Sequence, residues 1–128
     1  MKLNPDCIRD VLLYVEENTS LKKHVTITEQ TSHDLLNKYT YDEISYHVRQ
    51  CELSGYFERT THDITGNCSI SYLSPVGHQF LSNIRSDSVW HNVKEVSKKV
   101  GSNSLQAISQ IASAVITAII QNQLGFTP

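Results

Sequence analysis

The order of elements in residues 34–85 limits the fold of this chain more than any other feature of its sequence. A short helix is expected to run through Asp34, Leu35 and Leu36 and to end near Tyr39, and a second helix follows after a brief turn. A polar hairpin comes next, and the pair Ser74-Pro75 then opens a further helix. Several helices with a few short strands between them predict an α+β fold that is mainly helical.

The second helix of this segment has the clearest boundaries. Thr40 stands three residues before Glu43, which is the spacing of a capping box, where each side chain accepts a hydrogen bond from the other residue's backbone N–H. Gly55 offers the left-handed backbone conformation that ends many helices. The helical period predicts a core-facing side that contains Ile44, Val48 and Cys51, with Leu53 beyond them.

Further elements are expected before this helix. The tripeptide Asn4-Pro5-Asp6 is a strong helix start, and a first helix should run from it to about Asn18. Its buried stripe is predicted to contain Ile8, Val11, Leu12 and Val15. Val25–Thr28 alternates apolar and polar residues, which predicts a brief strand that can pair with the later hairpin. Thr31 or Ser32 is expected to cap the short helix that follows.

The hairpin itself is expected to have its strands at residues 56–60 and 69–73. Both segments have the composition of strands, and residues 61–68 between them contain the turn formers Asp63, Gly66 and Asn67. The helix after Ser74-Pro75 is predicted to carry an apolar face made of Val76, Phe80, Leu81 and Ile84.

Two short motifs in this region resemble motifs of known proteins. They are Leu53-Ser54-Gly55-Tyr56-Phe57 and Leu73-Ser74-Pro75-Val76-Gly77. From Thr40 to Phe80 the chain resembles bacterial winged-helix repressors of the multiple-antibiotic-resistance and arsenical-resistance type, in which a Leu-Thr-x-x-Gly segment follows the wing. The whole chain, including residues 77–85 and Trp90, more closely resembles a family of small bacterial and prophage proteins known only as a domain of unknown function.

These resemblances imply a winged helix-turn-helix domain in residues 1–85, followed by a helical arm in residues 86–128. The repressor resemblance implies a small DNA-binding or transcription-regulatory protein of bacterial or prophage type. The recognition helix would contact double-stranded DNA through Tyr41, Ser45, Tyr46 and Arg49. The wing would add Arg59, Thr61 and His62.

The charge of the chain keeps a second function open. Its 11 Lys and Arg residues stand against 13 Asp and Glu residues, so the formal net charge of −2 gives no overall attraction for phosphate. Asp42 and Glu43 also lie at the N-terminal end of the recognition helix, where carboxylates favour the helix dipole but repel DNA. The alternative is a non-enzymatic interaction module that binds a protein partner through the winged-helix face or the apolar C-terminal helix.

No residue pattern indicates catalysis, a cofactor or a metal. The cysteines are widely spaced, and the histidines are scattered without a zinc-ligand spacing. His47 is interpreted as a histidine with satisfied hydrogen bonds beside the core of its helix. The chain has neither a nucleophile elbow nor a phosphate-binding glycine-rich loop, so we expect no enzyme activity. The polar N-terminus lacks the apolar core of a signal peptide, which predicts a cytoplasmic protein.

The C-terminal segment has no charged side chain from Val100 to Pro128. Ser104 is expected to cap a helix that runs to about Asn122, and polar residues interrupt this helix too often for a membrane span. Its wide apolar stripe predicts a homo-oligomer, with packing onto the chain's own first helix as the alternative. The predicted oligomerisation residues are Leu105, Ile108, Ile111, Ala112, Val115 and Ile119.

Overall fold

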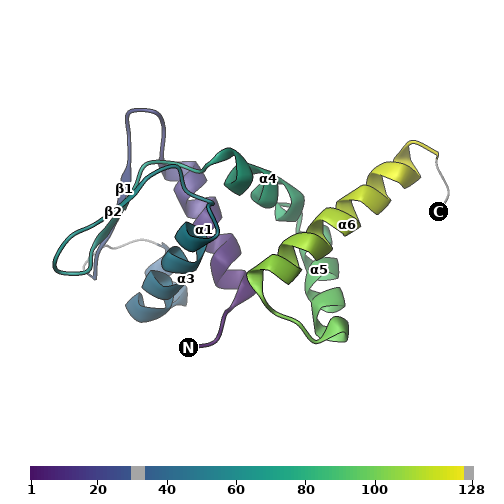
Figure 1. Cartoon of the computed structure of the whole chain (residues 1–128), viewed down its shortest axis with the longest axis horizontal. Helices are drawn as coiled ribbons and strands as arrows, with labels where there is room; N and C mark the ends of the chain where they lie inside the picture. Colours follow the sequence, from purple (N-terminus) through teal and green to yellow (C-terminus); the bar gives the residue numbers. More distant parts are fainter. Residues whose placement is uncertain (30–33, 126–128) are drawn as a thin grey trace. The chain divides into compact units, whose positions relative to one another are not determined.

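The computed structural model describes residues 1–29 and 34–125 (Figure 1). Within these residues the fold is mainly helical α+β, as predicted, with six helices and three short strands. The helices are α1 (Pro5–Asn18), α2 (Asp34–Lys38), α3 (Tyr41–Leu53), α4 (Pro75–Ile84), α5 (Asp87–Val100) and α6 (Leu105–Gln123). The strands are β1 (Val25–Ile27), β2 (Thr60–His62) and β3 (Cys68–Ile70). The chain divides inside α4 into two compact units, Met1–His78 and the part from Gln79 onward.

Helix α1 forms where its N-terminal signal predicts. The Asn4 side chain accepts a hydrogen bond from the backbone N–H of Asp6 at 3.0 Å, so a backbone donor at the helix start is satisfied. The predicted stripe is buried, and one cysteine joins it: Cys7, Ile8, Val11, Leu12 and Val15. This stripe packs against α3, which lies beside α1 in Figure 1.

Helix α3 begins with the predicted capping box. The backbone N–H of Glu43 donates to Thr40 Oγ1 at 3.1 Å, and the backbone N–H of Thr40 donates to Glu43 Oε1 at 3.1 Å. The helix ends before Gly55, whose φ of +78° confirms the left-handed conformation expected there. The cap expected at Thr31 or Ser32 for α2 lies outside the described residues.

Leu53 does not face the core, contrary to the prediction from the helical period. Its exposed fraction is 64%, whereas Ile44, Val48 and Cys51 are buried. Leu53 lies two residues after Cys51, and two residues rotate a helix by more than half a turn, so both side chains cannot share one face.

The three strands form one antiparallel sheet in the order β1-β3-β2. The predicted pairing of the first strand with the hairpin is confirmed, with Val25 opposite Ile70. The hairpin pairs Thr60 with Ile70. Strand β2 therefore starts at Thr60, the last residue of the expected strand, and includes Thr61 and His62, which were expected in the turn. The reason is a tighter loop, closed by a hydrogen bond from the backbone N–H of Asp63 to the Asn67 carbonyl at 3.0 Å.

Helix α4 starts at Pro75 as predicted. Ser74 Oγ accepts a hydrogen bond from the Gly77 N–H at 3.0 Å and donates one to the Gly55 carbonyl at 2.6 Å. Phe80, Leu81 and Ile84 are buried, but the prediction for Val76 is wrong, since 58% of it is exposed. Val76 lies in the first turn, about a quarter turn from the centre of the buried stripe.

The second unit contains two helices that pack against each other, α5 and α6. Gly101, with a φ of +78°, ends α5. The Ser104 side chain accepts a hydrogen bond from the Ala107 N–H and starts α6, as expected. Among the buried side chains are Trp90, Val93, Leu105, Ile108 and Ala112. The later half of α6 extends past α5 in Figure 1, and its side chains are exposed from Thr117 onward.

Candidate functional site

The outer face of α3 and the β2–β3 hairpin form the surface that carries the predicted site residues. On α3, Tyr41, Ser45 and Tyr46 are half-buried, and 55% of the Arg49 side chain is exposed. The Tyr41 hydroxyl lies 3.5 Å from the Gly66 carbonyl oxygen, so the start of α3 approaches the hairpin loop. Helix and hairpin together therefore present one continuous surface.

The inner face of α3 is anchored by His47, which is 1% exposed. Its Nε2 accepts a hydrogen bond from the backbone N–H of Asn4 at 2.8 Å, and its Nδ1–H donates to the Glu43 carbonyl at 2.6 Å. Because a backbone N–H can only donate, this geometry fixes the ring as the tautomer with the proton on Nδ1. The interpretation of His47 as a satisfied histidine is confirmed, and the residue ties the start of α1 to α3.

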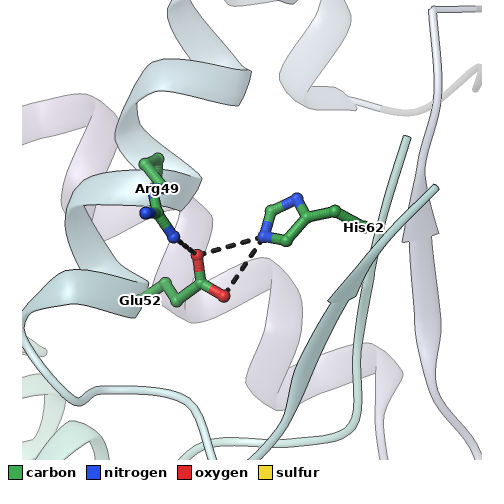
Figure 2. Close-up of polar contacts among 3 residues, drawn as sticks. All are labelled: Arg49, Glu52 and His62. Atoms are coloured by element: carbon green, nitrogen blue, oxygen red, sulfur yellow. Dashed lines mark hydrogen bonds and ion pairs between the residues drawn. The ribbon is translucent and has the colours of Figure 1, made fainter. Parts of the chain in front are cut away.

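A cluster of three polar side chains joins the end of α3 to the hairpin (Figure 2). Arg49 Nη1 donates a hydrogen bond to Glu52 Oε1. From β2, His62 Nε2 approaches the same carboxylate, at 3.1 Å from Oε1 and 3.2 Å from Oε2. Glu52 thus lies between a cation on its own helix and an imidazole on the hairpin.

The surroundings of Glu52 keep it ionised. Burial raises the pKa of its carboxyl, but hydrogen bonds from Arg49 and His62 and the positive charge near them outweigh burial, so the net pKa is lowered. Only 20% of the Glu52 side chain is exposed, against 43% for His62. The carboxylate is therefore the inner member of the cluster.

The predicted wing residues lie on two different faces of the sheet. Thr61 pairs with Ser69, whereas His62 pairs with the buried Cys68, and directly paired residues point to the same side. His62 therefore faces α3. Thr61 points to the opposite side, where it lines a depression together with Arg59, His24, Ser69, Ile70 and Ser71. The structure brings His62 together with Arg49, and it places Arg59 and Thr61 on the other face.

The loop at the end of the hairpin is held in shape by Asp63. Its Oδ1 accepts from the backbone N–H groups of Thr65 and Asn67, each at 2.9 Å, and from the Thr65 hydroxyl at 2.6 Å. These three hydrogen bonds lower the pKa of the Asp63 carboxyl, against a smaller opposing effect of burial. The loop presents Ile64 to solvent, with the whole side chain exposed.

Comparison with known proteins places the chain in a family. Residues 2–103 match the model of the family described as "Hypothetical protein (DUF2513)". The chain belongs to this family. The match confirms the expected membership in a family of unknown function. The chain is also 28% identical, over 123 residues, to an "Uncharacterized protein" of Haemophilus influenzae, a similarity that covers 94% of this chain and 99% of the relative. No solved structure shows a significant match.

Glu52 is the member of the candidate site that the sequence patterns did not predict. Its spacing of three residues from Arg49 is a visible signal for an ion pair on one helix face. Its contact with His62 has no comparable signal, because it depends on how the hairpin folds back onto α3. Arg49 and His62 were therefore predicted as site residues, whereas Glu52, which joins them, was not.

Acidic side chains are more numerous than basic ones in α3 and the hairpin. Across α3 and the hairpin, the acidic residues Asp42, Glu43, Glu52, Glu58 and Asp63 outnumber the basic residues Arg49 and Arg59. Glu43 is engaged in its capping box, and Asp63 in its loop. Any anionic partner would have to approach close to Arg49 and avoid the carboxylates around it.

The three cysteines lie in surroundings typical of structural thiols and not of reactive ones. Cys7, Cys51 and Cys68 are free thiols, and all three are buried. Burial raises the pKa of Cys7 to about 12 and that of Cys68 to about 11, and it also raises the pKa of Cys51. The thiols are therefore protonated at neutral pH and pack as small hydrophobes.

The described residues, 1–29 and 34–125, offer neither a metal site nor a membrane span. In this part of the chain, no group of three or more His, Cys, Asp or Glu side chains is arranged to hold a metal ion. No helix there combines the length and the apolar character that crossing a membrane requires.

Proposed function

We propose that the first unit is a winged helix-turn-helix domain that binds double-stranded DNA, as a small regulatory protein of bacterial or prophage type. The observation that carries this proposal is the order of elements α1-β1-α2-α3-β2-β3 combined with the sheet order β1-β3-β2. Two helices joined by a short turn, with the second exposed on one side, are the arrangement that places a recognition helix in the major groove. The hairpin that follows α3 occupies the position of a wing.

In this proposal α3 contacts DNA through its half-buried hydroxyl-bearing side chains and its arginine. Tyr41, Ser45 and Tyr46 can exchange hydrogen bonds with phosphates or base edges. Arg49 uses Nη1 for Glu52, and a guanidinium has five N–H donors, so its other donors can reach a phosphate. Arg59 and Thr61, on the far face of the sheet, contribute less in this arrangement.

Arg49→Ala should weaken binding to a short duplex about tenfold, because it removes one phosphate contact. The slope of log K against log salt should also become shallower by about one. Fluorescence anisotropy at several salt concentrations measures both quantities. Arg59→Ala makes the same chemical change on the other face of the sheet and should lower the affinity less than threefold (~0.7 kcal/mol). Equal losses in the two variants would contradict the assignment of α3 as the DNA-facing element.

A second candidate function is protein recognition through the same surface. The excess of carboxylates on α3 and the hairpin favours it, and so does the fully exposed Ile64 at the end of the loop. A partner would then be a protein with a basic surface that receives Ile64. The absence of DNA binding even at low salt would make this the better function.

We also propose that α6 joins two copies of the chain. Leu105, Ile108 and Ala112 are already buried within a single chain, so they are not available to a second copy. The surface left for it contains Ile111, Val115, Ile116, Ile119 and Ile120, which are half-buried or exposed. Because no charged side chain occurs from Val100 to Pro128, pairing with the same helix of another copy would bury no unpaired charge. A dimer would also suit a two-fold DNA site.

Ile119→Glu should convert this dimer to a monomer by placing a carboxylate in the apolar seam. We expect the dimer dissociation constant to rise about 30-fold (~2 kcal/mol), since the charge must be desolvated without a partner. Light scattering after size exclusion gives the mass. Thr117→Glu adds the same charge at an exposed position and should leave the dimer intact. A monomeric parent protein would refute the proposal, as would an unchanged mass for Ile119→Glu.

A further inference from the structure

Glu52 has an arrangement that a simple surface ion pair does not require. It is the least exposed member of its cluster, with 20% of its side chain accessible against 55% for Arg49 and 43% for His62. Both of its oxygens lie within hydrogen-bonding distance of the His62 ring, and one of them also accepts from Arg49. Figure 2 shows the carboxylate between the two nitrogen-bearing side chains.

We infer that Glu52 is an internal competitor for phosphate, which occupies Arg49 and His62 in the free protein and yields them to the DNA backbone on binding. This inference rests on the proposed DNA-binding function and assigns a regulatory role to one residue of that site. The carboxylate and a phosphodiester offer the same ligands to these side chains, namely a pair of anionic oxygens that accept charge-assisted hydrogen bonds. One can therefore replace the other without a change in the donors.

The position of Glu52 explains how the competition would act. It lies three residues from Arg49 on the same helix, so the two side chains meet without any rearrangement of the chain. His62 comes from the hairpin, so the same carboxylate also holds the hairpin against α3. A phosphate gains the Nη1 donor of Arg49 only by breaking its contact with Glu52, and the carboxylate then lies close to the incoming negative charge. Arg49 consequently contributes less to affinity than an unpaired arginine would.

The competition selects among DNA complexes. A phosphate that approaches loosely, as in non-specific binding, gains less from Arg49 than a well-placed phosphate does, because Glu52 satisfies the Nη1 donor of the arginine equally well. A phosphate held in register by the rest of α3 can displace the carboxylate. Glu52 thus reduces binding to DNA in general more than binding to a well-fitted site.

Glu52→Gln tests this role, because glutamine keeps the shape and one acceptor oxygen but removes the charge. We expect the affinity for random duplex DNA to rise about tenfold, and the salt slope to steepen, because the Nη1 donor of Arg49 also becomes available to phosphate. Glu58→Gln is the matched control, since it makes the same change of net charge on the hairpin and Glu58 has no ion pair with Arg49 among the described residues. It should raise the affinity less than twofold (~0.4 kcal/mol).

Two comparisons distinguish competition from a general effect of charge and from a purely structural role of Glu52. In an Arg49→Ala background the gain from Glu52→Gln should fall below twofold (~0.4 kcal/mol), because no arginine remains to be released. An equal gain in both backgrounds would show a general charge effect and overturn the inference. Unchanged or weaker binding by Glu52→Gln, together with faster amide exchange in β2, would mean that Glu52 only braces the hairpin and would also overturn it.

Failure of DNA binding itself would be recognised separately. If no variant binds DNA at low salt, the proposed function fails, and inorganic phosphate then serves as the probe. Phosphate should shift the NMR signals of the Arg49 side chain and the His62 ring more strongly in Glu52→Gln than in the parent protein. Equal shifts in both proteins, or no shift in either, would overturn the role of Glu52 as a competitor.

Discussion

Gly77→Ala should destabilise the first unit by at least about 3 kcal/mol, the upper range for forcing an extra carbon into a packed site. A Cβ at this position would lie 2.2 Å from the Tyr56 carbonyl oxygen, 3.0 Å from its carbonyl carbon and 3.1 Å from its Cα. All three neighbours are backbone atoms, so no side chain can rotate away to make room. Urea unfolding followed by circular dichroism measures the loss.

The clash arises because the start of α4 sits directly on the beginning of the hairpin. The backbone N–H of Ser74 donates to the Tyr56 carbonyl at 2.9 Å, and Ser74 Oγ donates to the Gly55 carbonyl at 2.6 Å. Gly66→Ala is the control, since nothing lies within 4 Å of its added carbon and only its φ of +91° is strained. That strain should cost about 1 kcal/mol. Equal stability of the two variants would contradict the close approach of α4 to the hairpin.

His47→Ala should lower the free energy of unfolding by about 3 kcal/mol. The substitution leaves a cavity at a position that is 1% exposed, and it removes the acceptor of the Asn4 backbone N–H. It also removes the donor to the Glu43 carbonyl, so the start of α1 loses its link to α3. Chemical denaturation measures the change, and amide exchange at the start of α1 should become faster.

The comparison for this variant is His24→Ala, at an exposed histidine of the same unit. Its effect should stay within about 0.5 kcal/mol, as for most surface substitutions. A loss below about 1 kcal/mol for His47→Ala would mean that water replaces the imidazole between the two backbone groups. The structural role assigned to His47 would then be wrong.

Helix starts were predictable because their signals are local. Asn4, Thr40 and Ser104 each accept a hydrogen bond from a backbone N–H two or three residues ahead, so the sequence alone contains both partners. Gly55 follows a helix end for an equally local reason, the left-handed backbone that it adopts. These positions define the elements on which the candidate site is built.

Positions at the edge of an element were harder to predict. Leu53 and Val76 are apolar and lie at the end of α3 and the start of α4, where the helical period alone says little about which neighbours cover them. The strand bounds of the hairpin shifted because three hydrogen bonds to Asp63 Oδ1 shape the loop. The composition of residues 61–68 predicted where this loop lies. The residues at which the loop begins and ends are set by the pairing of Thr60 with Ile70.

The candidate site shows the same division between local and long-range information. Helix geometry predicts that Tyr41, Ser45 and Arg49 share a face of α3. The separation of His62 from Thr61 requires the register of the sheet, because a shift by one residue would exchange their faces. The contact between Glu52 and His62 requires the hairpin to lie against α3, which no short-range pattern encodes.

Titration of the full-length parent protein with random and genomic duplex DNA, from low to physiological salt, is the decisive experiment for the proposed DNA binding. We expect binding at low salt that weakens steeply as salt increases, from a protein whose mass by light scattering on the same sample is that of a dimer. A folded protein that binds no duplex even at the lowest salt would contradict the DNA-binding proposal and would direct attention to a protein partner for α3 and the hairpin.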